Sequence, residues 1–171
     1  EKIRREKENH LSGKAGFIRW KLNSLLDEEI IDELYQAAQA GVKVDIVARG
    51  ICAIRMSHVA DTHNVRIRSI LGRFLEHSRI YYFHNGGNPE YFIGSADIMD
   101  RNLNRRIETL VQVLNPAHTE KLEEILELSF SNTINHWYMD ENDAWHQVHL
   151  DENGNPLIDI QNYFVERSRN D

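Results

Sequence analysis

The feature that most constrains the fold is a strand–helix–strand pattern in the first third of the sequence. The segment AGFIRWKLNSL alternates apolar and polar residues and predicts a strand near residues 16–24. Residues 26–41, LDEEIIDELYQAAQAG, carry apolar side chains at helical spacing, acidic residues in the first turn and Gly41 just past the helix end. Residues 42–50, VKVDIVARG, predict a second strand. Within one sheet, this βαβ unit makes a right-handed crossover between parallel strands.

The middle of the sequence predicts further strands and one long helix. Residues 50–64 have mixed character and are expected to form a loop. Residues 115–134 are amphipathic at helical spacing, with Pro116 near the start. Strands are expected over residues 65–71, 79–84, 90–95 and 105–114, and the turn signature NGGNP joins the second of these to the third. This order predicts an α/β fold with a mixed β-sheet sandwiched by helices.

Both ends of the sequence are less regular. Residues 144–159, AWHQVHLDENGNPLID, predict a small hairpin around Asn153 and Gly154, and the polar tail beyond it is expected to be disordered. The chain opens with EKIRREKENH, which has the character of the end of a charged helix and does not begin with methionine. We therefore expect the chain to be a piece of a longer polypeptide.

Composition excludes several classes of protein. With 41% hydrophobic and 27% charged residues and only three prolines, the chain is typical of a globular domain. No apolar run approaches the roughly 20 residues that a membrane-spanning helix needs. The single cysteine, Cys52, has no partner for an internal disulfide, and no Cys/His cluster has zinc spacing. A cytoplasmic protein is the default expectation.

Positive charge is concentrated in one part of an acidic chain. The net charge is −7, yet residues 49–79 contain six arginines against Asp61 and Glu76, a local balance of +4. From Glu120 onward, twelve acidic residues face three basic ones, a balance of −9. Arginine binds phosphate through a planar, bidentate fork. The cluster therefore favours a local anion site over a nucleic-acid surface, unless these arginines pair with carboxylates from elsewhere.

Three segments carry candidate site residues. His77 and Arg79 are two positions apart, and if the strand begins at His77 their side chains leave the same face, roughly 7 Å apart at the backbone. Arg49 ends the second strand of the βαβ unit, where open α/β sheets place their ligands. Ser95 and Asp97 follow the strand that the hairpin pairs with the first. These segments can converge on one phosphoryl group.

Each of these residues also has a purely structural explanation. A lone histidine at the mouth of a strand is more often a hydrogen-bonded surface residue than a catalyst. Arg79 can pair with Glu76, and NGGN joins two strands, so a plain turn is favoured there over a phosphate loop. Asp97 and Asp100 can bind a metal or cap the next segment. The histidines of the loop and of the acidic end lack convincing metal co-ligands; they are His58, His63, His146 and His149.

A family resemblance changes this balance. The segments KLNSLLDEEIIDELYQAAQAGVKVDIVARGIC, VRIRSILGRFLEHSRIYYFHNGG and YFIGSADIMDRNLNRRIETLVQV closely resemble the last domain of bacterial polyphosphate kinase, the type that makes long-chain polyphosphate. The resemblance covers residues 13–134, which are therefore expected to form the C-terminal catalytic domain. Residues 1–12 are expected to be the end of a preceding connection, and residues 135–171 a C-terminal hairpin and tail. It implies a phospholipase-D-like fold.

The resemblance also implies a reaction. The family reversibly moves the terminal phosphoryl group of ATP onto polyphosphate, with Mg²⁺ and through a phosphohistidine that lies in a preceding domain absent from this sequence. ATP or ADP, polyphosphate and the upstream domains are the implied partners, with no nucleic acid. No metal ligand is assigned to this chain. The family further implies a homo-oligomer, cytoplasmic with peripheral membrane association.

The resemblance assigns roles to individual residues. His77 matches the family's second essential histidine and is expected to act as an acid, a base or a phosphate-binding group, not as the nucleophile. Arg49 matches a residue that contacts the phosphates of the nucleotide, and a fixed guanidinium neutralises phosphoryl charge without a proton transfer. Arg79, Ser95 and Asp97 lie in matching motifs and are weaker candidates for ATP or phosphate binding.

Two alternatives remain open from the sequence. A phospholipase-D-like hydrolase typically needs a His-x-Lys motif on each of two halves, and this chain has one half, with Arg79 in place of lysine. The other alternative is a non-catalytic fragment that binds anions, which is the expectation for this chain on its own.

Overall fold

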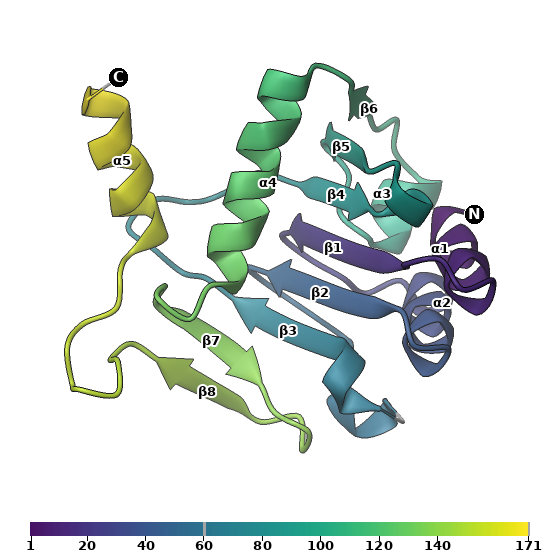
Figure 1. The fold of residues 1–171 in the computed structure, drawn as a ribbon, viewed down its shortest axis with the longest axis horizontal. Coiled ribbons are helices and arrows are strands. Elements are labelled where there is room, and N and C mark those ends of the chain that lie inside the picture. Colours follow the sequence, from purple (N-terminus) through teal and green to yellow (C-terminus); the bar gives the residue numbers. More distant parts are fainter. Residues whose placement is uncertain (60, 171) are drawn as a thin grey trace.

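A mixed sheet runs through the middle of the molecule (Figure 1). The computed structural model describes residues 1–59 and 61–170. Within them the sheet has eight strands in the order β6-β5-β4-β1-β2-β3-β7-β8. The strands are β1 (Phe17–Leu22), β2 (Lys43–Ala48), β3 (Val65–Ser69), β4 (Ile80–Phe83), β5 (Glu90–Gly94), β6 (Leu110–Val113), β7 (His136–Met139) and β8 (Trp145–Val148).

Helices cover both faces of this sheet, as the sequence predicted. They are α1 (Lys2–Leu11), α2 (Glu28–Gln39), α3 (Asp100–Asn104), α4 (Pro116–Phe130) and α5 (Ile160–Asn170), with 3-10 turns at Met56–His58, Thr62–Asn64 and Asn85–Gly87. Helices α4 and α5 lie on one side of the sheet, and α1 and α2 on the other (Figure 1). Among the residues described, none of the helices combines the length and the apolar character that a membrane-spanning segment requires.

The βαβ unit forms as predicted. Strands β1 and β2 pair in parallel, from Phe17 opposite Lys43 to Leu22 opposite Ala48. Between them, the Asp27 carboxylate caps α2 by accepting a hydrogen bond from the Ile30 N–H at 3.0 Å. Gly41 ends the helix with a φ of +101°, in the left-handed region that glycine adopts without strain.

The two faces of the sheet differ in polarity. Ile18 and Trp20 of β1 point toward α2 and join the main apolar core, whereas Arg19 and Lys21 alternate to the face that α4 covers. Arg19 is nevertheless only 8% exposed, and its guanidinium lies 3.2 Å from the carboxylate of Glu127 on α4. The central strand therefore has one apolar face and one buried, charge-paired face.

The outer strands are short. Strand β6 pairs with β5 on one side only and forms one edge of the sheet, and its residues Leu110 and Val111 are 54% and 51% exposed. Strand β8 forms the opposite edge.

Three local predictions differ from the structure. The strand expected over residues 105–114 is limited to β6, and helix α3 was not predicted. Strands β7 and β8 form a hairpin upstream of the predicted one. The predicted turn around Gly154 is also present, closed by a bridge between Leu150 and Pro156 and by a hydrogen bond from the Asp151 N–H to the Asn155 carbonyl at 2.8 Å. The tail expected to be disordered forms α5.

The sequence contains a signal for α5 that was overlooked. Ile160, Tyr163 and Phe164 follow the i, i+3, i+4 spacing of an apolar helix face, and Ile160 is buried with Phe130 and Ile134. Asp159 accepts hydrogen bonds from the N–H groups of Gln161 and Asn162 at 2.8 and 3.0 Å. A single apolar turn and a cap are thus enough to order this polar segment.

Helix α1 is joined to the sheet by a buried carboxylate. The Glu6 side chain is fully buried and accepts hydrogen bonds from the backbone N–H groups of Phe17, at 3.2 Å, and Asn85, at 2.8 Å. Ile3, one turn earlier, is buried in the main core. Whether residues 1–12 also continue a preceding domain stays a prediction.

We expect Glu6→Ala to lower the free energy of unfolding by about 1–3 kcal/mol, because two buried backbone donors lose their acceptor. Urea unfolding followed by circular dichroism measures the change. Glu8→Ala is the matched control, since Glu8 is an exposed residue of the same helix. Equal effects of the two substitutions would show that the buried carboxylate contributes nothing specific.

Candidate active site

The sheet brings the predicted site segments to one edge. Strands β1 and β2 both end there, and Asn23 and Arg49 follow directly after them. Strand β4 is antiparallel to β1, with Ile80 opposite Lys21, so the segment that precedes β4 lies at the same edge. Strand β5 returns antiparallel to β4 and ends nearby, shortly before Asp97. Segments that are distant in sequence therefore meet at the carboxyl ends of the parallel strands.

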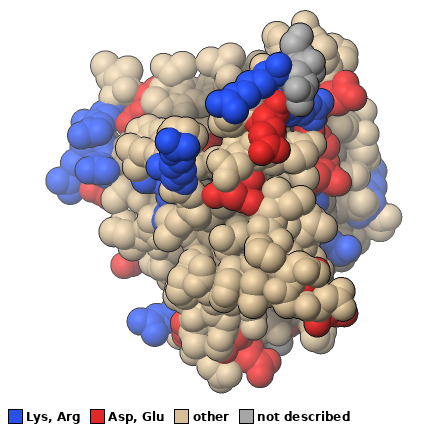
Figure 2. All heavy atoms as spheres, turned by 90° about the vertical axis from the view of Figure 1, so that its left-hand side faces the viewer, with Lys and Arg blue, Asp and Glu red and all other residues tan. Residues whose placement is uncertain are grey.

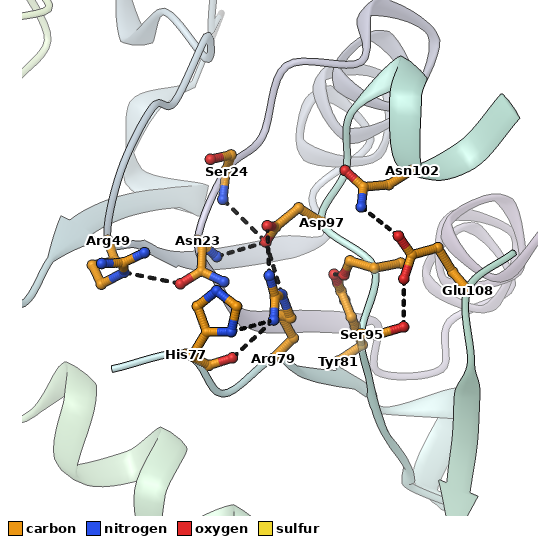
Figure 3. Close-up of polar contacts among 11 residues, drawn as sticks. Asn23, Ser24, Arg49, His77, Arg79, Tyr81, Ser95, Asp97, Asn102 and Glu108 are labelled. Atoms are coloured by element: carbon orange, nitrogen blue, oxygen red, sulfur yellow. Dashed lines mark hydrogen bonds and ion pairs between the residues drawn. The ribbon is translucent and has the colours of Figure 1, made fainter. Parts of the chain in front are cut away.

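Asp97 lies at the centre of this edge. It is 4% exposed, and its Oδ1 accepts hydrogen bonds from the N–H groups of Asn23, at 2.8 Å, and Ser24, at 3.2 Å (Figure 3). Arg79 donates to both carboxylate oxygens, with Nε 3.2 Å from Oδ1 and Nη2 2.9 Å from Oδ2. This carboxylate joins the end of β1 to the start of β4.

These contacts shift the pKa values of both Asp97 and Arg79. Burial raises the pKa of Asp97, but the hydrogen bonds from Arg79, Asn23 and Ser24 outweigh burial and hold the pKa below its usual value. The hydrogen bond to Asp97 raises the pKa of Arg79 despite burial. The pair is therefore ionised at neutral pH.

Arg79 also holds His77. Its Nη1 lies 3.1 Å from His77 Nδ1 and donates to the His77 carbonyl oxygen at 3.0 Å (Figure 3). Because a guanidinium has no acceptor, Nδ1 must accept this hydrogen bond. The neutral imidazole then carries its proton on Nε2 and presents an N–H donor from an exposed side chain.

Arg49 is anchored through one nitrogen. Its Nε donates to Asn23 Oδ1 at 2.9 Å, while its Nη1 and Nη2 have no hydrogen-bond or ion-pair partner in the described part of the chain. Asn23, 5% exposed, lies between Arg49 on one side and Arg79 with His77 on the other (Figure 3). The guanidinium is thus oriented by a neutral amide and keeps its positive charge uncompensated by a carboxylate.

A second ion pair fixes the residue before His77. Lys21 is 4% exposed, and its ammonium lies 3.1 Å from the carboxylate of Glu76. Burial lowers the pKa of Lys21 most, and nearby Arg49 lowers it further, against the opposing effect of Glu76. The suggested pairing of Arg79 with Glu76 is therefore wrong: Arg79 pairs with Asp97 and Glu76 with Lys21.

Ser95 belongs to a neighbouring set of contacts. Its hydroxyl donates to Glu108 and accepts from the Thr109 N–H at 3.1 Å, and Asn102 donates to the same carboxylate at 2.6 Å. Both partners of the Ser95 hydroxyl therefore lie in the segment before β6, and neither of them is His77 or Arg49.

Most arginines of the cluster in residues 49–79 bind other groups of the protein. Arg66 pairs with Asp45, and Arg68 donates to the Ser131 carbonyl and to Asn132, both at 2.9 Å. Arg55 lies 4.0 Å from Asp143. Figure 2 views the molecule from the left-hand side of Figure 1, and both signs of charge are scattered over this face. An anion site here depends on a few oriented groups and not on a broad basic field.

Two buried side chains of the site were missed by sequence reasoning. Asn23 and Lys21 are two positions apart on the same face at the end of β1. Their signal was a lysine within an otherwise buried strand and a polar residue at the strand's carboxyl end. In the sequence, Lys21 reads as one of the exposed positions of an alternating strand, since nothing there shows that it pairs with Glu76.

We expect Asp97→Ala to lower the free energy of unfolding by about 3 kcal/mol at pH 7, because it leaves Arg79, whose side chain is 10% exposed, without its carboxylate partner. Urea unfolding measures the loss, and Asp100→Ala, at an exposed ion pair, is the control and should cost about 0.5 kcal/mol or less.

The difference in unfolding free energy between the wild type and Asp97→Ala should also depend on pH. Since the folded-state pKa of Asp97 is depressed, its stabilisation is present above the unfolded value of about 3.9 and is lost as the pH falls through the folded value. The gap in stability between the wild type and Asp97→Ala should therefore narrow in acid. A gap that is constant from pH 7 to pH 3 would contradict the ionic role.

Comparison with known proteins identifies relatives of this arrangement. The family described as polyphosphate kinase C-terminal domain 2 matches residues 1–158. The polyphosphate kinase of Streptomyces coelicolor is 45% identical over 98% of this chain, and polyphosphate kinase 1 of Chlorobaculum tepidum is 42% identical over 98%. The chain spans 22% and 24% of their lengths, so it corresponds to less than a quarter of either protein.

Solved structures agree on the fold. The crystal structure of the polyphosphate kinase from Porphyromonas gingivalis superposes with a TM-score of 0.85 and 36% identity, over 99% of this chain and 26% of that one. Nuc from Salmonella typhimurium, a phospholipase D family member, superposes with a TM-score of 0.51 over 73% of this chain and 84% of its own. At 21% identity the second match shows the fold alone, and it confirms the predicted phospholipase-D-like architecture.

Proposed function

Because the chain belongs to the polyphosphate kinase family, we propose that it is part of an enzyme that reversibly transfers the terminal phosphoryl group of ATP to inorganic polyphosphate. In this proposal the chain supplies half of the site for ATP and polyphosphate. One phosphoanhydride bond of ATP is broken and one in polyphosphate is made, so the reaction runs in both directions. The site's main task is to position the phosphates and neutralise their charge.

The observation that carries the proposal is the state of Arg49. Its Nε is held by Asn23, while both Nη groups lack a protein partner among the described residues. A guanidinium that is oriented in this way but not paired with a carboxylate is suited to bidentate binding of a phosphate. We propose that Arg49 binds the phosphates of the nucleotide.

His77 is proposed to act beside Arg49 on the group being transferred. With Nδ1 held by Arg79, the Nε2–H is the donor that the ring offers to a phosphoryl or bridging oxygen. This favours hydrogen bonding to the phosphate over a role as a nucleophile, which needs an unprotonated nitrogen. If the Arg79 contact opens, the ring can also exchange a proton with a leaving or attacking oxygen.

The remaining candidates have supporting roles in this proposal. Arg79 and Asp97 hold each other and His77, so they position the imidazole and do not themselves contact the phosphates. Ser95 is bound to Glu108, and in this proposal it supports the neighbouring segment before β6 and does not bind phosphate.

Other parts of the reaction are assigned outside this chain. We propose that the histidine that carries the phosphoryl group lies in an upstream domain, and that the enzyme is a cytoplasmic homo-oligomer able to associate peripherally with a membrane. Within the described ranges no three His, Cys, Asp or Glu side chains form a metal-binding group, and both oxygens of Asp97 are already bound. These residues do not fit a resident Mg²⁺ site, so the ion is proposed to arrive with ATP.

We expect His77→Ala and Arg49→Ala, each in the complete enzyme, to lower kcat for polyphosphate synthesis by about 10²-fold or more. The physical reason is the loss of an oriented donor in one variant and of a fixed positive charge in the other. Growth of radiolabelled polyphosphate from ATP and Mg²⁺ measures both.

Matched controls remove the same residue types from other places. His118 lies on α4 and Arg169 on α5, and both side chains are exposed, so His118→Ala and Arg169→Ala should keep nearly full activity. Near-normal activity of both His77→Ala and Arg49→Ala would reject the proposed site.

The chain on its own is expected to bind polyphosphate or nucleotide weakly and to synthesise nothing, because most of the enzyme's length is missing from it. Incubation of residues 1–171 with ATP and Mg²⁺, beside the complete enzyme as a positive control, measures chain growth. Robust synthesis by the isolated chain would overturn the assignment of the phosphohistidine to an upstream domain.

A further inference from the structure

The segment that carries His77 has no regular secondary structure and little burial to hold it. It connects β3, which ends at Ser69, to β4, which begins at Ile80. Three of its apolar side chains face outward: Leu71, Phe74 and Leu75 are 60%, 51% and 76% exposed. Because exposed side chains contribute little hydrophobic stabilisation, polar contacts must limit the motion of this segment.

Two of these contacts flank His77 and a third lies before it. Glu76 is bound by Lys21, and Arg79 by Asp97. At Phe74, the side chain of Gln161 makes two reciprocal bonds with the backbone: Phe74 N–H donates to Oε1 at 2.8 Å, and Nε2 donates to the Phe74 carbonyl at 2.9 Å. A side-chain amide thus pairs with Phe74 as a neighbouring strand would.

Gln161 is itself firmly placed. It belongs to the first turn of α5, where its N–H donates to Asp159 at 2.8 Å, and Ile160 beside it is 3% exposed. Further along α5, Arg167 pairs with Glu124 of α4. The helix is therefore attached to the body of the domain at both ends, and Gln161 transmits this attachment to the segment before His77.

The Gln161 side chain passes so close to the backbone of Gly72 that a larger residue would collide with it. A Cβ atom at this position would overlap the side-chain amide of Gln161, whereas the backbone of Gly72 does not itself require glycine. Glycine, the smallest residue, therefore occupies the position next to which the Gln161 amide lies.

We propose that Gln161 is a positioning residue that acts through His77: α5 clamps the 71–79 segment and so keeps the imidazole aligned with Arg49. The inference rests on the proposed function of the site. It also assigns a role to a helix that begins beyond residues 1–158, the part that the family description matches. Neither the chemistry nor the phosphate contacts are attributed to Gln161.

The first test replaces Gln161 in the complete enzyme. Gln161→Ala should lower kcat about 10-fold with little change in the KM for ATP, since a reacting group displaced by about 1 Å loses much of its effect. Amide hydrogen exchange should become faster at Phe74. Asn162→Ala is the matched control, because this exposed neighbour on the same helix makes no side-chain hydrogen bond among the described residues.

A second variant disturbs the same contact from the other side. Gly72→Ala should displace the Gln161 amide and lower kcat to a similar extent, while leaving α5 unchanged. In a Gln161→Ala background the added methyl group has room, so Gly72→Ala should then cause no further loss. This result would not be expected if either substitution simply unfolded the protein.

A third arm asks whether the effect passes through His77. If it does, adding Gln161→Ala to His77→Ala should leave the residual rate within about 2-fold of that of His77→Ala alone. Wild-type kcat in Gln161→Ala, or the same 10-fold loss in both backgrounds, would overturn the inference. Failure of the proposed function is distinguishable, because His77→Ala would then keep its activity.

Discussion

The buried carboxylate of Asp97 is the contact on which the rest of the site depends. It is bound by the backbone at the end of β1 and by Arg79 at the start of β4, so it closes the edge of the sheet between two antiparallel neighbours. Burying a charge costs free energy unless it is paired and hydrogen-bonded, and here both oxygens are. The same arginine then orients His77, so that stability and orientation of the imidazole derive from one ion pair.

The two arginines that the sequence offered as phosphate-binding candidates are held by different means. Arg49 is oriented by a neutral amide, which leaves its charge available, whereas Arg79 is neutralised by Asp97. Although both arginines were candidates from the sequence, their partners separate them into one that can bind an anion and one that supports the site. A guanidinium already engaged by a carboxylate has little left to offer a phosphate.

The sequence was informative where a pattern is local. The alternation in residues 16–24 and the helical spacing before Gly41 correctly predicted β1 and α2. The strand ends indicated one edge of the sheet, and Asn23, Arg79 and Asp97 are joined there by hydrogen bonds. The sequence did not show in the same way which charged side chains form ion pairs with each other. Glu76 is close to Arg79 in sequence but is bound by Lys21, since the register of β1 against β4 decides which charges meet. Helix α5 was missed because its apolar face is one turn long, and its packing against Phe130 is not visible in the sequence.

Strand β6 has a consequence for handling the domain apart from the rest of such an enzyme. It is the outermost strand of the sheet, and Leu110 and Val111 leave much of their surface to solvent. A row of backbone donors and acceptors beside apolar side chains is a template for intermolecular strand addition. Self-association through this edge would then limit the concentration at which the separated domain stays monodisperse.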